Sequence, residues 1–72
     1  MFLEIKPYES EVVLDTDRII SVKKQRDNFK CSLFITFETN SNSNTVEYNY
    51  HKEFDRCEKD YKNILETLTK GS

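Results

Sequence analysis

Apolar and polar residues alternate along several stretches of this chain before residue 51. The clearest stretch is residues 31–39. The positions on one side of it are Cys31, Leu33, Ile35 and Phe37, while Phe34 falls on the other side among polar residues. Strict alternation in a stretch rich in β-branched and aromatic residues is typical of a strand buried on one face. We interpret this stretch as the central strand of a small sheet.

Shorter alternating stretches predict further strands at residues 2–6, 11–14, 19–23 and 45–50. Residues 7–10 turn the first of these strands back on the second, since Pro7 cannot donate to a strand ladder. Asp15 is expected to close a turn after the second strand, because a short carboxylate bonds backbone N–H groups two residues on. Residues 24–28 are predicted to be a polar turn. Residues 40–44 (Asn-Ser-Asn-Ser-Asn) are predicted to be a mobile hairpin loop, longer than a two-residue turn.

From about residue 52 the apolar spacing changes to steps of three and four, which predicts a helix over residues 52–70. Its apolar stripe is Phe54, Cys57, Tyr61, Ile64, Leu65 and Leu68. Acids in its first turn and Lys70 in its last agree with the helix dipole. Strands followed by one helix predict an α+β fold. We expect a single domain over residues 1–72, an antiparallel β-meander of about four to five strands (1–50) packed against one C-terminal helix (52–70).

Composition and charge disfavour several classes of protein. The net charge of −2 disfavours non-specific binding to nucleic acid or membranes. Neither a signal peptide nor a membrane-spanning stretch is expected. Cys31 and Cys57 both fall on predicted core faces, which indicates buried, reduced thiols in a cytoplasmic protein, with a strand–helix bridge in an oxidising compartment as the alternative. A chain of 72 residues buries a small core, so self-association is expected to help stabilise it.

Residues 14–22 (Leu-Asp-Thr-Asp-Arg-Ile-Ile-Ser-Val) resemble a segment of very short bacterial and phage proteins, of which the FlbD-like family of flagellar operons is the nearest named one. In these proteins an opening strand, an aliphatic residue and an Asn/Asp-Thr/Pro-Asp turn precede an aliphatic strand, a hairpin and a terminal helix. The resemblance therefore implies the same order of elements, and it implies no catalytic residues. Together with the Asn/Ser/Lys/Tyr-rich composition, it suggests phage or mobile-element coding.

The sequence contains no arrangement typical of a catalytic or metal-binding site. His51 has no neighbouring nucleophile, because Cys57 is expected to point into the core. Zinc sites need about four closely spaced Cys or His ligands. Asp15 and Asp17 are interpreted as turn formers. We therefore expect neither enzymatic activity nor a cofactor.

A binding function is therefore expected, and the sequence offers two candidate binding surfaces. Val13, Ile19 and Phe34 are expected on the sheet face opposite the helix, where an exposed apolar cluster marks a protein interface unless Phe2 or Tyr8 folds over it. This leads to the first hypothesis, a self-associating protein that also binds and blocks a host or defence protein. The alternative is a nucleic-acid-binding module that uses the basic segment beside Phe29 and Phe34. Its bases are Arg18, Lys23, Lys24, Arg26 and Lys30.

Overall fold

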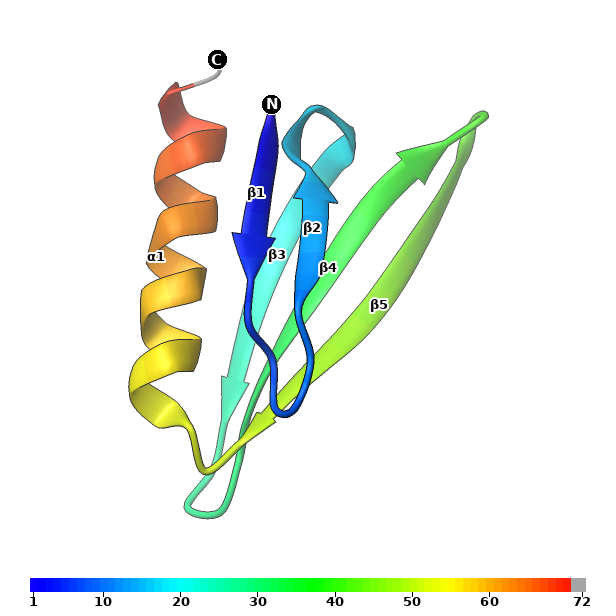
Figure 1. Ribbon diagram of the computed structural model, residues 1–72. Coiled ribbons are helices and arrows are strands. Elements are labelled where there is room, and N and C mark those ends of the chain that lie inside the picture. Colours follow the sequence, from blue (N-terminus) through cyan, green and yellow to red (C-terminus); the bar gives the residue numbers. More distant parts are fainter. Residues whose placement is uncertain (71–72) are drawn as a thin grey trace.

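The computed structural model describes residues 1–70 and confirms an α+β fold of antiparallel strands packed against one C-terminal helix (Figure 1). The elements are β1 (Phe2–Ile5), β2 (Val12–Asp15), the short 3-10 turn η1 (Thr16–Arg18), β3 (Ile19–Arg26), β4 (Cys31–Thr39), β5 (Asn42–His51) and α1 (Phe54–Lys70).

The strands form two sheets and not one continuous meander. β1 and β2 make an antiparallel hairpin in which Leu3 pairs with Leu14. β3, β4 and β5 make a three-stranded sheet with β4 in the centre, as predicted. The break falls at η1, where the Asp15 carboxylate accepts the Asp17 N–H at 3.1 Å and so closes the predicted turn. This turn redirects the chain, so β2 does not lie beside β3.

One face of the three-stranded sheet carries both α1 and the β1–β2 hairpin (Figure 1). The buried cluster between these layers draws on every strand and on the helix. Its members are Ile5, Leu14, Ile19, Cys31, Leu33, Ile35, Tyr50, Cys57 and Ile64. Of the predicted helix stripe, Leu65 is 38 % exposed, while Phe54, Tyr61 and Leu68 pack against the cluster. The helix begins at Phe54, two residues later than predicted.

The turn between β4 and β5 corrects the prediction of a five-residue loop at 40–44. Thr39 pairs with Asn42, so only Asn40 and Ser41 lie between the strands. Both have positive φ, 44° and 72°, as the two central residues of a type I′ turn require. Asn adopts the left-handed region more readily than most residues, which allows this tight turn without glycine. The far ends of β4 and β5 therefore form a regular arm that extends beyond the rest of the molecule (Figure 1).

The turn between β3 and β4 is also shorter than predicted. β3 continues to Arg26, so residues 24–26 are strand and not turn. The Asp27 carboxylate accepts the N–H groups of Phe29 and Lys30 at 2.7 and 2.8 Å. These two bonds lower the pKa of Asp27, Phe29 contributing most. A single carboxylate thus closes the turn in place of the longer polar segment.

Cys31 and Cys57 are joined by a disulfide, which overturns the prediction of reduced thiols. Both residues are fully buried, and their Cα atoms lie 6.5 Å apart. The pairing follows from the topology, because the first residue of the central strand faces the first turn of α1. The bond therefore ties the start of the central strand to the start of the helix.

Candidate interaction surface

The three residues predicted to form an interface lie in three different environments. Val13 is 63 % exposed on the outer face of the β1–β2 hairpin. Phe34 is half-buried on the sheet face opposite α1, since its alternation partners Leu33 and Ile35 belong to the core. Ile19 is 9 % exposed and belongs to the core cluster, so its predicted exposure is wrong. The structure therefore does not bring Val13, Ile19 and Phe34 together.

The misplacement of Ile19 has a local cause in β3. The register with β4 shifts between Ile19 and Ser21, so one residue is added to this strand. An extra residue in one strand reverses the face to which the residues before it point, relative to the residues after it. Ile19 therefore pairs with Phe37 and lies on the core face, while Ile20 is 53 % exposed.

Phe34 occupies the centre of an otherwise polar face. In register it lies between Lys23 of β3 and Glu47 of β5. The next row carries Thr36 and Thr45, whose hydroxyl oxygens are 2.9 Å apart in a hydrogen bond. A shallow hollow of about 360 Å³ crosses these rows. Antiparallel sheets commonly leave one face in water, so this face alone does not indicate a partner.

On the hairpin's outer face Val13 has an apolar neighbour, Phe2, which was not among the predicted interface residues. Phe2 is 72 % exposed and sits diagonally from Val13, because Phe2 pairs with Asp15 and Val13 pairs with Glu4. Sequence alternation in 2–6 contained this signal, since placing Leu3 and Ile5 inward leaves Phe2 outward. The pair is small and lies on the side of the molecule away from Phe34.

The five bases of the 18–30 segment are dispersed over several surfaces. Lys24 Nζ lies 2.7 Å from a Glu58 carboxylate oxygen and 5.1 Å from the Tyr61 ring centre. Arg26 reaches the same oxygen at 3.5 Å and stacks 4.5 Å over the Phe54 ring. The other three are Lys23 on the open sheet face, Arg18 beside Asp15, and Lys30 in the turn at Asp27.

Glu58 is the centre of this arrangement on α1. The hydrogen bond from Lys24 lowers the pKa of Glu58, and the charges of Lys24 and Arg26 act in the same direction. Two of the bases proposed for nucleic acid thus contact a carboxylate of their own chain. They fasten β3 to α1.

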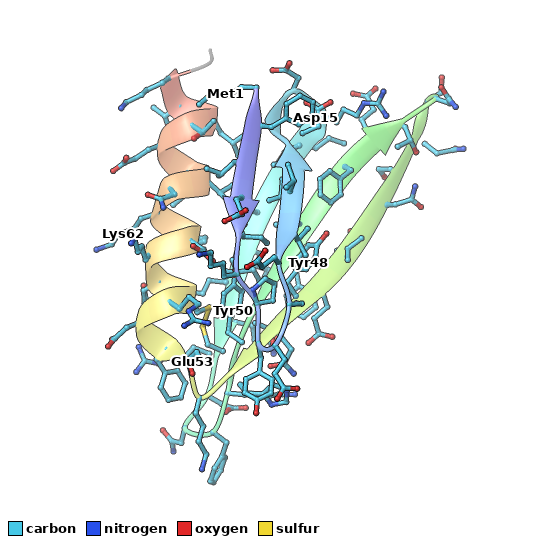
Figure 2. All side chains as sticks on the ribbon, in the orientation of Figure 1. Met1, Asp15, Tyr48, Tyr50, Glu53 and Lys62 are labelled. Carbon is cyan, nitrogen blue, oxygen red and sulfur yellow. A yellow bond between two sulfur atoms is a disulfide. The ribbon has the colours of Figure 1, made fainter. Side chains whose placement is uncertain are left out.

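A buried polar cluster connects the helix to both sheets. Tyr50, labelled in Figure 2, extends from β5 toward α1. Its hydroxyl donates to Asp60 Oδ2 at 2.8 Å, and the Lys6 backbone N–H donates to the same oxygen at 3.0 Å. Asp60 is 8 % exposed. The sequence held a signal for it, because Asp60 follows Cys57 by three residues and precedes Ile64 by four, which places it on the apolar stripe. A carboxylate at such a position needs buried donors.

Tyr50 is expected to make the folded protein less stable at alkaline pH. Burial, together with the hydrogen bond to Asp60, raises the pKa of the Tyr50 hydroxyl far above its usual value. The folded state therefore holds this proton more tightly than the unfolded chain, whose tyrosine pKa is about 10. The stability gained is complete below about pH 10 and falls as the pH rises beyond it. Urea unfolding from pH 8 to 11 should show this fall.

Tyr50→Phe is the matched variant for that measurement, since it removes the hydroxyl and keeps the ring. It should reduce the fall in unfolding free energy at alkaline pH. A smaller fall should remain because of Tyr48, whose pKa burial also raises. Equal slopes in both proteins would contradict the assignment to Tyr50.

No arrangement for catalysis or metal binding emerges in the part of the chain that the structure describes. Within residues 1–70, no group of three His, Cys, Asp or Glu side chains is placed to hold a metal ion. The His51 ring lies edge-on to Tyr8 at 4.6 Å, and the Cys57 sulfur is bonded to Cys31. An open groove of about 470 Å³ beside Asp60 is lined by charged side chains of both signs from β1 and α1. No helix within these residues is long and apolar enough to cross a membrane.

Comparisons with protein-family models, curated proteins and solved structures gave no match. The resemblance of residues 14–22 to the FlbD-like proteins therefore stays a prediction.

Proposed function

We propose that this protein is a small, non-catalytic interaction protein that associates with itself. The observation that carries the proposal is the incomplete covering of the three-stranded sheet. Since α1 and the β1–β2 hairpin share one face, the opposite face and most of the outer edge of β5 have no covering element within residues 1–70. Small domains commonly gain stability by association, and an open sheet edge is a template for it.

The experiment is light scattering coupled to gel filtration, over a hundredfold range of protein concentration. We expect the mass to rise with concentration from 8.6 kDa toward a multiple of it. A mass of one chain at every concentration would contradict self-association. Protein purified without nuclease, at low and at moderate salt, lets the same experiment detect bound nucleic acid by its absorbance.

The nucleic-acid alternative receives less support from the geometry. Its binding would need Lys24 and Arg26 to leave Glu58, and their aromatic neighbours, before they could contact phosphates. Lys23 and Phe34 remain together on the open face, but Glu47 lies beside them. We therefore keep self-association as the proposal.

The disulfide changes the expected location. The prediction of a cytoplasmic protein rests on two reduced thiols, whereas disulfides persist mainly in oxidising compartments. We propose that the protein works where the Cys31–Cys57 bond survives. Alkylation of free thiols under denaturing conditions, in cells quenched with acid, tests this. Two alkylated cysteines per chain would show that the bond is reduced in the cell, and would contradict an oxidising compartment.

A further inference from the structure

The outer edge of β5 presents backbone groups whose direction the structure determines. In a two-residue hairpin, the residues that flank the turn exchange both of their backbone hydrogen bonds, and such pairs alternate with non-bonded pairs. Thr39 and Asn42 flank the turn, so Asn42, Asn44, Val46 and Tyr48 bond inward to β4. The intervening residues of β5 then point outward.

An independent contact confirms this alternation. The Asn49 carbonyl accepts the Tyr8 N–H at 3.2 Å, so Asn49 points away from β4. Counting back by twos along the regular part of β5, the N–H and C=O groups of Ser43, Thr45 and Glu47 face outward. The side chains of residues 42–47 are all exposed. These three residues therefore form an open edge that is ready to bond another strand.

This edge carries few of the features that prevent strand pairing. Edge strands are normally protected by lysines, prolines, bulges or short length. The other edge strand, β3, carries Lys23, Lys24 and Arg26 as well as the register shift near its start. In β5, residues 42–50 contain neither lysine nor proline, and Glu47 is their single charged residue. The chain thus protects one edge and leaves the other open.

We propose that the open edge of β5 pairs, antiparallel, with the β5 edge of a second copy of this chain. The inference rests on the proposed self-association and names the surface that performs it. With Thr45 opposite Thr45 of the second copy, Ser43 lies opposite Glu47 in both directions. Ser43, Thr45 and Glu47 of each chain are then all bonded to the other copy, and the two sheets become one sheet of six strands.

Charge favours this partner and this register. The two Glu47 carboxylates lie opposite serines and not opposite each other, whereas a register centred on Glu47 would place them face to face. Two β3 edges would oppose lysine and arginine side chains of like sign. The pairing is also two-fold symmetric, so it closes at the dimer and leaves no further β5 edge to extend the assembly.

The test is Thr45→Pro, compared with Thr45→Val. Proline removes the outward N–H at a position that gives no bond to β4, so the monomer keeps its strand ladder. Valine loses the hydroxyl bond to Thr36 as proline does, but it keeps the N–H. Sedimentation velocity over a concentration series, with circular dichroism as the check on folding, gives the dimer dissociation constant. We expect Thr45→Pro to weaken the dimer at least about tenfold, through the loss of two symmetry-related bonds, and Thr45→Val to dimerise like the wild type.

The outcomes separate the inference from the function on which it rests. A wild-type protein that is monomeric at every concentration overturns both. A dimer that survives Thr45→Pro overturns only the edge pairing; if Phe34→Asp then abolishes it, the open sheet face is the interface. Assemblies that grow beyond the dimer and persist in Thr45→Pro also overturn the inference, because they are built on a surface other than the β5 edge. Where Thr45→Pro unfolds the chain, Thr45→Lys places two lysines directly opposite each other in the proposed register and is expected to weaken the dimer in the folded protein.

Discussion

Replacing Cys31 and Cys57 together by alanine is expected to lower the free energy of unfolding by about 3 kcal/mol, because the disulfide closes a loop of 26 residues in the unfolded chain. Such a loss is large against the total stability of a domain of this size, about 5 kcal/mol. Urea denaturation of the oxidised wild type and of the double variant measures the difference directly.

Reductant provides the control for the disulfide prediction. The wild type in a strong reductant should approach the stability of the double variant, while the variant itself should not respond. If the oxidised wild type and the double variant unfold at the same urea concentration, the bond contributes no stability and the prediction is wrong.

Asp60→Ala is expected to destabilise the fold by a comparable amount, again about 3 kcal/mol. The substitution leaves the buried Tyr50 hydroxyl and the Lys6 N–H without their acceptor, and each unsatisfied buried donor costs about 1–3 kcal/mol. Thermal and urea unfolding measure the loss. Glu66→Ala, on the exposed side of the same helix, is the control and should change stability by less than about 0.5 kcal/mol.

A double-mutant cycle identifies the interaction responsible. The effects of Asp60→Ala and Tyr50→Phe should not add, because both variants remove the same hydrogen bond. Additive effects would show that the two residues act independently, which contradicts the geometry of the cluster.

Alternation and helical spacing predicted most of the elements, because each strand and α1 buries one face. The turn at Asp15 was also predictable, since the bond from its carboxylate to the Asp17 N–H is local. Features that depend on the backbone conformation of one or two residues were not predictable from the sequence. The type I′ turn rests on two positive φ values at Asn40 and Ser41, and the sequence there resembles any polar loop. The register shift after Ile19 has no glycine or proline to mark it.

The predicted grouping of Val13, Ile19 and Phe34 on one face was wrong for the same reason as the register. One added residue in β3 moved Ile19 from the surface to the core, and the division into two sheets separated Val13 from Phe34. The ion pairs of the basic segment could not be predicted because their partners are distant in sequence, Glu58 lying 34 residues from Lys24. The choice between reduced thiols and a disulfide could not be predicted either, since the distance between two buried cysteines depends on how α1 crosses the sheet.

The Lys6–Asp60 hydrogen bond also bears on the order in which the chain folds. It joins residues 54 positions apart, so the β1–β2 hairpin cannot complete its packing until the helix at the other end has formed. The β4–β5 hairpin needs only its two-residue turn, and short loops close fastest. The β1–β2 hairpin would therefore be the last part of the described chain to dock, because Asp60, the acceptor that anchors it, lies in the helix.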